Sequence, residues 1–284
     1  MNARLLLGDA MVRAAAEDQV ARVETHHTPL SEATPEYVER GMATVAKSLE
    51  RLAARGKLSA DARAATLARI RPTTDINDLG QCDLVVEAVL EDYELKAGII
   101  RELDAICGET AIFATNTSSI SVTQIAAASR HPERVVGMHF FNPVPMMQLV
   151  EVIRALQTSD AVCDSVVALV DSLGKKARVS KDSYGFVVNR VLIPMINEAI
   201  NCVYEGLASP EDIDSMMKLG ANHPMGPLSL ADLIGLDVVL DIMETLYRGF
   251  DDPKFRPSPL LKQMCHAGYL GRKKCRGFFT YAAA

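Results

Sequence analysis

The 284-residue sequence lacks the marks of several protein classes. It has no run of about 18 apolar residues, the length that a helix needs to cross a bilayer, so we expect no membrane span. Its first 30 residues have no basic start leading into an apolar stretch and a cleavage site, and we expect a cytoplasmic protein. The 30 lysines and arginines against 36 acidic residues give a formal net charge of -6, which argues against a protein that coats nucleic acid.

The sequence also lacks a recognisable metal site. Its six cysteines form no CxxC pair and show no Cys/His spacing that suits zinc. His26 and His27 are adjacent, and adjacent side chains on a regular element point in different directions. We therefore expect buried free thiols and no metal. With 49% hydrophobic residues and only 13 prolines, the composition is that of a folded protein, for which two domains fit the length.

The hydrophobic pattern changes near Tyr184. Before it, short β-branched runs alternate with amphipathic helices in which apolar residues recur every three or four positions. The expected strands are 84–89, 111–115, 135–140, 149–153 and 177–179, and the expected helices are 37–55, 60–70, 92–106, 122–128 and 160–173. This alternation predicts a parallel sheet with helices on both faces. After Gly185 only helices are expected, at 186–204, 210–219, 228–247 and 258–267. The predicted domains are therefore an α/β domain over 1–184 and an all-α domain over 185–284.

Polar residues follow two of the predicted strands at the same edge of the sheet. Residues 116–119 (NTSS) come directly after strand 111–115, and His139 lies near the end of strand 135–140. Open α/β sheets bind ligands at the carboxyl ends of their strands. Two simpler interpretations stay open. Residues 116–119 are also typical of a helix N-cap, and a lone histidine at a strand end is often structural.

Glu151 gives His139 a candidate partner. This glutamate lies in an apolar run, LVEVI, where an unpaired carboxylate is costly to bury. An imidazole oriented by a carboxylate is a general base that works near neutral pH. We therefore predict a pair between His139 and Glu151.

Five motifs together resemble those of the L-3-hydroxyacyl-CoA dehydrogenases. They are NTSSIS at 116–121, GMHFFNPVPMMQLVEVI at 137–153, KDSYGFVVNR at 181–190, HPMGPLSLADLIGLD at 223–237 and GRKKCRGFF at 271–279. The resemblance spans about residues 39–281 in one register and is strongest to the bacterial branch that acts on 3-hydroxybutyryl-CoA. It implies a Rossmann-like dinucleotide-binding domain followed by an all-α dimerisation domain.

The resemblance also implies a reaction and a set of site residues. (S)-3-Hydroxybutyryl-CoA and acetoacetyl-CoA would be interconverted by hydride transfer to NAD or NADP. His139 would be the general base, Glu151 would orient it, and Ser118 and Asn189 would hold the reacting oxygen and the thioester. The implied cofactor contacts are Glu91, Lys96, Asn116, Asn142 and Lys273. The implied coenzyme A contacts are Ser48, Arg55, Lys57 and Ser118.

The N-terminus departs from the family pattern. That pattern opens with a strand, a GxGxxG turn, a helix and a second strand, but residues 1–38 contain no GxGxxG. They offer instead an apolar triplet at 5–7, an Ala-rich helix-like stretch at 9–23 and a polar segment. We expect the first βαβ unit to be atypical or missing, which would leave strand 84–89 at an exposed sheet edge.

Two single residues also differ from the family. Cys275 stands where glycine is usual, and a positive φ at that position would strain a residue with a Cβ. Tyr184 stands where proline is usual and should loosen the domain junction.

Three functional hypotheses are consistent with these features. The leading one is the dehydrogenase. The second is a non-catalytic, acyl-CoA-binding or dimer-forming protein that has lost its dinucleotide site, and the third is a related dehydrogenase that acts on a sugar acid. In all three, the apolar helices from residue 186 onward exceed what a small domain buries internally, so we predict a homodimer through the helical domain.

Overall fold

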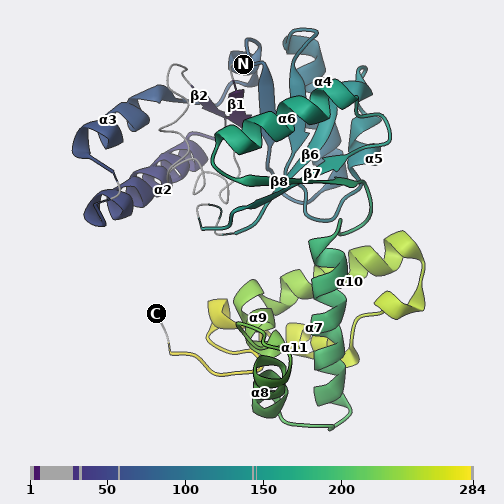
Figure 1. Cartoon of the computed structure of the whole chain (residues 1–284). Helices are drawn as coiled ribbons and strands as arrows, with labels where there is room; N and C mark the ends of the chain where they lie inside the picture. Colours follow the sequence, from purple (N-terminus) through teal and green to yellow (C-terminus); the bar gives the residue numbers. More distant parts are fainter. Residues whose placement is uncertain are drawn as a thin grey trace. The chain divides into compact units, whose positions relative to one another are not determined.

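The computed structural model of the chain describes residues 3–6, 28–31, 34–56, 58–142, 144 and 146–282. The chain divides into two compact units, Met1–Asp182 and Ser183–Ala284, which are drawn in Figure 1. The helix-like stretch predicted at 9–23, and His26 and His27, lie outside the described residues. All six cysteines are free. Within the described ranges, no helix has the length and hydropathy that a bilayer crossing requires, and no three His, Cys, Asp or Glu side chains gather as a metal site would need.

One eight-stranded sheet forms the centre of the first unit. Its strands are β1 (Ala3–Leu6), β2 (Thr28–Ser31), β3 (Ile70–Thr73), β4 (Leu84–Glu87), β5 (Ile112–Thr115), β6 (Val135–Phe140), β7 (Leu149–Arg154) and β8 (Lys176–Lys181). They lie in the order β3-β2-β1-β4-β5-β6-β7-β8. Neighbours from β3 to β6 are parallel, whereas β7 is antiparallel to β6 and parallel to β8. The order 3-2-1-4-5-6 is that of dinucleotide-binding sheets, whose ligand crevice lies where the order reverses, here between β1 and β4.

The N-terminal strands correct one prediction from the sequence. β1 pairs with β4 through Ala3↔Leu84 and Leu5↔Val86, and β2 pairs with the other side of β1. β4 therefore lies inside the sheet, and the prediction that it would form an exposed edge is wrong. The prediction relied on the missing glycine motif, whereas strand pairing needs only extended backbone with free N–H and C=O groups.

β3 is a strand that the sequence pattern does not predict. Its sequence, IRPT, contains a proline, and only Ile70 of its four residues is buried. The helix expected over 60–70 accordingly ends at Arg69. A polar four-residue segment carries almost no periodic signal, so its pairing with β2 is decided by tertiary structure.

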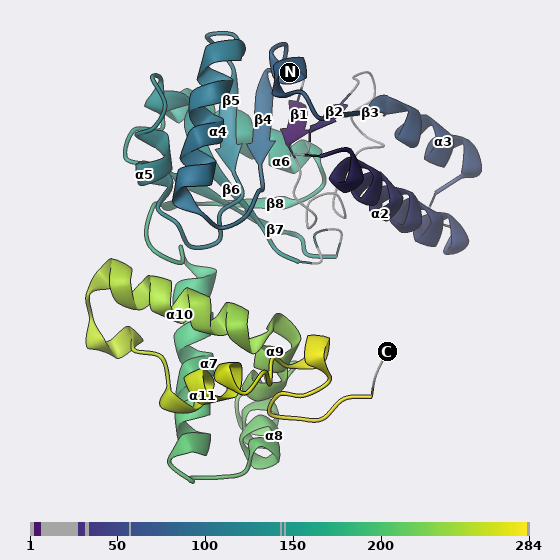
Figure 2. The same ribbon diagram turned by 180° about the vertical axis from the view of Figure 1, so that it is seen from behind.

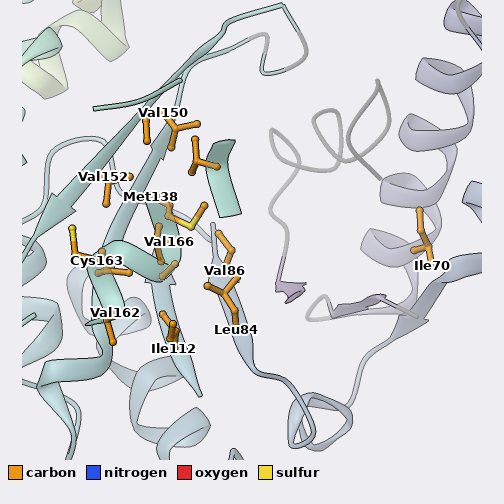
Figure 3. Packing of buried hydrophobic residues seen from close by; sticks show 14 of the residues in the cluster. Ile70, Leu84, Val86, Ile112, Met138, Val150, Val152, Val162, Cys163 and Val166 are labelled. Atoms are coloured by element: carbon orange, nitrogen blue, oxygen red, sulfur yellow. The ribbon is translucent and has the colours of Figure 1, made fainter. Parts of the chain in front are cut away.

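Helices cover both faces of this sheet. α6 (Asp160–Ser172) packs on one face, and α4 (Tyr93–Ile106) and α5 (Val122–Ala126) pack on the other (Figures 1 and 2). The N-cap Ser159 starts α6 by accepting a hydrogen bond from the Val162 amide. Val162 and Val166 then repeat at a spacing of four and meet apolar side chains of β4 to β7 in a buried core (Figure 3).

A helical hairpin lies beside β3. It consists of α2 (Pro35–Ala54) and α3 (Ala60–Arg69), which contact one another and β3 (Figure 2). Val45, Leu49 and Leu52 are buried on α2, where the sequence periodicity predicts its apolar face. The opposite face of α2 is charged and exposed.

The second unit is helical, as predicted. Its helices are α7 (Val188–Tyr204), α8 (Pro210–Gly220), α9 (Pro227–Ile234), α10 (Leu236–Phe250) and α11 (Pro259–His266). Ser209 caps α8 and Pro210 opens it, which confirms the predicted helix start. The single helix expected over 228–247 is instead two helices, because Gly235 adopts a φ of +106° that no α-helix accommodates.

The two unusual residues have clear surroundings. Cys275 has a φ of 57°, in the left-handed region, which confirms that this position favours glycine. Tyr184 packs edge-to-face on Phe250 at a centroid distance of 5.5 Å. A Cβ added at Gly249 would lie 2.4 Å from Cγ of Tyr184, so the tyrosine fills space that this glycine leaves open. A loosened domain junction stays a prediction.

Candidate active site

The pairing of β6 with β7 places His139 directly opposite Glu151. Nδ1 of His139 lies 2.8 Å from Oε2 of Glu151, and the two residues are only 4% and 3% exposed. A proton on Nδ1 that is shared with the carboxylate leaves the lone pair on Nε2. The structure thus brings the predicted pair together, in the arrangement that orients an imidazole as a general base.

Asn116 connects the ends of three neighbouring strands. Its backbone amide donates to the carbonyl oxygen of Glu87 at 2.7 Å, and its side-chain oxygen accepts from the amide of Phe140 at 2.9 Å. Asn116 therefore ties the end of β5 to β4 on one side and to the residue after His139 on the other. The next side chain, Phe141, packs its ring at 4.6 Å from the imidazole of His139.

The turn that follows Asn116 is held by Glu91. One carboxylate oxygen of Glu91 accepts from the Thr117 hydroxyl at 2.6 Å, from the Ser118 amide at 2.8 Å, and from the amide and hydroxyl of Ser119 at 2.9 and 3.0 Å. Burial raises the pKa of Glu91, but the charge of Lys96 and these hydrogen bonds together hold that pKa below its usual value. Glu91 is therefore an anion that shapes the backbone on either side of Ser118.

The N-cap interpretation of residues 116–119 is wrong. α5 is capped by Ser121, whose hydroxyl accepts from the amide of Gln124. Residues 116–119 form a separate turn between β5 and this cap. The turn is fixed by an acid from the β4–α4 loop, so it belongs to the ligand-binding edge of the sheet.

A buried ion pair lies behind Glu91. Nζ of Lys96 is 3.0 Å from Oε1 of Glu87 and 3.5 Å from Oε2 of Glu91, and it also donates to the carbonyl oxygen of Val89. The side chains of Lys96 and Glu87 are 0% and 1% exposed, whereas that of Glu91 is 38% exposed. Lys96 therefore acts here through Glu91 and not at the surface.

Comparison with known proteins identifies the family. The family model for the NAD-binding domain of 3-hydroxyacyl-CoA dehydrogenase matches residues 9–183, and the model for the C-terminal domain of that enzyme matches residues 185–281. The chain belongs to the 3-hydroxyacyl-CoA dehydrogenase family. It is an oxidoreductase with a Rossmann-like NAD-binding domain and a helical C-terminal domain. The match begins at residue 9, so the family similarity reaches further toward the N-terminus than the motifs from residue 39 onward indicate.

Individual dehydrogenases are similar over nearly the whole chain. A probable 3-hydroxybutyryl-CoA dehydrogenase of Deinococcus radiodurans is 51% identical over 263 residues, covering 93% of this chain and 94% of the relative. The 3-hydroxybutyryl-CoA dehydrogenase of Bradyrhizobium diazoefficiens is 47% identical, covering 93% of this chain and 90% of the relative. The crystal structure of (S)-3-hydroxybutyryl-CoA dehydrogenase from Ralstonia eutropha has a TM-score of 0.94 and 49% identity and covers 99% of both chains.

The described sheet edge fits the family's dinucleotide in the chemistry of its side chains. Glu91 exposes part of its carboxylate next to the reversal point of the strand order, and Asn142 is exposed just after β6. A carboxylate accepts hydrogen bonds from ribose hydroxyls, and an amide side chain both donates and accepts. The segment after β1, where the family has its glycine turn, lies outside the described residues.

Asn189 and Lys273 belong to the helical unit. Asn189 lies in the first turn of α7 and is 9% exposed. Nζ of Lys273 forms an ion pair with Asp237 at 2.5 Å. The segment that carries Lys273 is anchored by Asp232, whose carboxylate accepts from the amides of Phe278 and Phe279. Both predicted site residues are therefore held in place within the helical unit.

The segment of the α2–α3 hairpin contains three of the four residues predicted to meet coenzyme A. Ser48 is 5% exposed on the inner face of α2. Arg55 is exposed at the C-cap of the same helix, and Lys57 lies outside the described residues. Of the two described hairpin residues, Arg55 is the one whose side chain is directly accessible to a ligand, and the fourth predicted contact, Ser118, is half-buried in the turn after β5.

Two residues of the site escape the sequence analysis. Glu87 lies in LVVEAV, an apolar run like the one that drew attention to Glu151, and the same reasoning would have predicted a buried partner. Lys175 gives no such signal, since it stands in a polar stretch, GKKAR, yet it is 3% exposed and touches the loop after Asn142.

Proposed function

We propose that the chain interconverts (S)-3-hydroxybutyryl-CoA and acetoacetyl-CoA, with NAD or NADP as the hydride carrier. The observation that carries this proposal is the buried pair of His139 and Glu151 at the ligand-binding edge of the sheet. The names of the similar proteins of Deinococcus, Bradyrhizobium and Ralstonia support the substrate. They favour the dehydrogenase over a non-catalytic acyl-CoA-binding protein and over an enzyme of sugar acids.

Each residue of the site has a role in this reaction. In the oxidative direction, Nε2 of His139 takes the proton of the 3-hydroxyl group as the C3–H bond breaks. The dinucleotide, when bound, supplies the acceptor for the hydride that leaves C3. Glu151 stabilises the imidazolium that forms, and in the reverse direction the same imidazolium returns its proton to the developing alkoxide. Ser118 and Asn189 hold the reacting oxygen and the thioester by hydrogen bonds.

The proposed binding residues fall into two groups, one for the dinucleotide and one for coenzyme A. We assign Glu91, Asn116, Asn142 and Lys273 to direct contacts with the dinucleotide, and Lys96 to the support of Glu91. For coenzyme A we assign the exposed cation Arg55, which suits a phosphate group, together with Lys57, Ser48 and Ser118. Because Ser48 is buried in the structure, its contribution requires the ligand to reach the inner side of α2.

We further propose a homodimer through the helical unit. Large apolar side chains are exposed on it, with Leu219 at 86%, Leu207 at 74%, Val191 at 68% and Met216 at 63%. Met216 and Leu219 are three residues apart, so they share one face of α8. A second copy of the chain would bury these side chains. Light scattering at low micromolar concentration should show a dimer, and a single 30.9 kDa species would refute this proposal.

We place the protein in the cytoplasm. The support is its six free cysteines, because thiols persist in reducing compartments and tend to form disulfides outside them. Fractionation of cells that express the chain should recover it with cytoplasmic markers.

The activity is tested by the oxidation of NADH that depends on acetoacetyl-CoA, with NADPH in parallel. Replacing His139 with Ala should lower kcat by about 10²- to 10⁴-fold, the usual contribution of a positioned acid–base group. His131→Ala is a matched control, because the His131 side chain is 46% exposed and its nearest acidic partner, Glu133, lies at the surface 3.5 Å away. Full activity in the His139→Ala variant would refute the mechanism.

Calorimetry distinguishes the alternative of a non-catalytic protein. A chain that binds acetoacetyl-CoA but neither NADH nor NADPH, and shows no turnover, would be a binding protein that has lost its dinucleotide site. Binding of both ligands together with turnover supports the dehydrogenase.

A further inference from the structure

Lys175 is a buried cation that the reaction does not use. It lies between the end of α6 and the first residue of β8, and only 3% of it is exposed. Its ammonium group donates to the carbonyl oxygens of Val144 at 2.6 Å and Met147 at 2.8 Å. Both acceptors belong to the loop 141–148, which joins β6 to β7 and of which the structure describes residues 141, 142, 144 and 146–148.

Two carbonyl oxygens provide the stabilisation of this charge. In the described part of the chain, no carboxylate lies within ion-pair distance of Lys175, and burial lowers the pKa of its ammonium group. Burying a cation without an acid is costly, so the compensating interactions are the two hydrogen bonds to the loop. The neighbouring Lys176 has an exposed side chain and holds the loop only through its backbone, which donates to the carbonyl oxygen of Gln148.

The loop 141–148 connects the two halves of the catalytic pair. One residue separates the start of the loop from His139, and two residues separate its end from Glu151. Phe141 packs on the imidazole of His139, and the exposed Asn142 comes next. The pair itself is aligned by the hydrogen-bonded register of β6 and β7, whereas the conformation of the loop depends on what fastens it.

We propose that Lys175 is a positioning residue that fastens the loop 141–148 in the conformation that presents Asn142 to the nicotinamide dinucleotide. This inference rests on the proposed function, because it takes Asn142 as a cofactor contact. It predicts a specific kinetic signature. Loss of the fastening weakens dinucleotide binding, while proton transfer between His139 and the substrate continues.

The test compares Lys175→Met with Lys176→Met in the full-length protein. Methionine keeps most of the side-chain volume and removes the ammonium group. For Lys175→Met we expect the KM for NADH to rise about tenfold, the effect of about 1.4 kcal/mol in binding, with kcat within about twofold of wild type. Lys176→Met should leave both constants unchanged. A purely structural role of Lys175 would instead lower the active fraction, which reduces kcat and leaves KM unchanged.

Hydrogen–deuterium exchange of the peptide that contains residues 141–148 gives a second readout that does not need activity. We expect faster exchange in this peptide in Lys175→Met and no change in the peptides of α4 or α5. If the wild type shows no turnover, the proposed function fails while the exchange result still reports on the fastening. If the wild type is active and Lys175→Met keeps the wild-type KM, the inference about Lys175 is wrong.

A milder variant covers the case in which Lys175→Met does not fold. Lys175→Gln keeps an N–H donor for the carbonyl oxygens and removes the charge, and we expect about a threefold rise in the KM for NADH. Failure of both variants to fold would also overturn the proposal, because Lys175 would then support the whole unit and not the loop.

Discussion

Replacing Lys96 with Met should destabilise the protein more than any comparable change on its surface. The ammonium group of Lys96 lies 3.0 Å from Oε1 of Glu87, and both side chains are fully buried. Glu87 also accepts from the amide of Val89 at 2.6 Å and from the Thr115 hydroxyl at 2.8 Å. Lys96→Met would leave the Glu87 carboxylate buried with these two neutral donors and no cation.

The magnitude follows from this arrangement. Removal of one partner from a buried ion pair costs about 3–5 kcal/mol, because the other charge stays buried. We expect about 3 kcal/mol for Lys96→Met, since the two remaining donors partly compensate Glu87. The double variant Lys96→Met/Glu87→Gln removes both charges and keeps an acceptor for the Thr115 hydroxyl. It should therefore cost only about 1–2 kcal/mol, less than the single change.

Urea unfolding followed by circular dichroism measures these differences through the midpoint and slope of the transition. Lys47→Met is the matched control, because Lys47 is an exposed lysine on a helix, and its change should stay within about 0.5 kcal/mol. Two results would refute the reasoning. One is a cost below about 1 kcal/mol for Lys96→Met, and the other is a double variant at least as unstable as the single one. Either result would mean that the ion pair between Lys96 and Glu87 does not account for the stability contributed by the buried Lys96 side chain.

Three further predictions test the site and the packing. Glu151→Gln keeps the shape but not the charge opposite His139, the proposed general base, so kcat/KM should fall roughly 10- to 150-fold, and unchanged kinetics would argue against the proposed role of Glu151. Gly98 lies in α4, where an added Cβ meets nothing within 4 Å, so Gly98→Ala should stabilise the protein by about 1 kcal/mol. Gly249→Ala should instead destabilise it by about 1–3 kcal/mol, because the added Cβ would clash with the Tyr184 ring. Thermal unfolding of both variants measures the direction of each change. Folding lowers the pKa of Glu91, so the stability that its ionised carboxylate contributes is complete above the unfolded pKa near 4.5 and is lost as the pH falls through the lower folded pKa. The midpoints of urea unfolding at pH 3 and pH 6 should therefore differ less in Glu91→Gln than in wild type.

Local sequence predicted those parts of the fold whose signal is periodic and strong. The apolar residues of α2 repeat at helical spacing, and the run at 84–87 is β-branched and wholly buried as β4. β3 and the break at Gly235 could not be predicted in the same way. A polar strand is defined by the neighbour that it pairs with, and a glycine inside an apolar stretch does not by itself disclose a φ of +106°. β1 and β2 were not predicted, because the glycine-rich turn that follows the first strand in the family pattern is absent from this sequence.

The residues of the site likewise include some that the sequence predicts and some that it does not. Asn116 and His139 were predicted because both follow or end strands of one parallel sheet, which is a topological rule. The cation that fastens the loop 141–148 could not be found from sequence, because Lys175 is 28 residues from Met147 along the chain and resembles a surface lysine. Contacts at that separation are set by the packing of β7 against β8, which local patterns do not encode.

Two glutamates in apolar strands are similarly buried but have different basic partners. Glu87 ends β4 and Glu151 lies in β7, and each is buried against a basic side chain. The partner of Glu87 is Lys96, which also contacts Glu91 and donates to the carbonyl oxygen of Val89, so that pair stabilises the loop before α4. The partner of Glu151 is a histidine, whose imidazole can accept a proton and return it. In the proposed reaction, the carboxylate of Glu151 therefore stabilises the imidazolium that forms when His139 takes a proton, whereas the carboxylate of Glu87 supports the loop that follows β4.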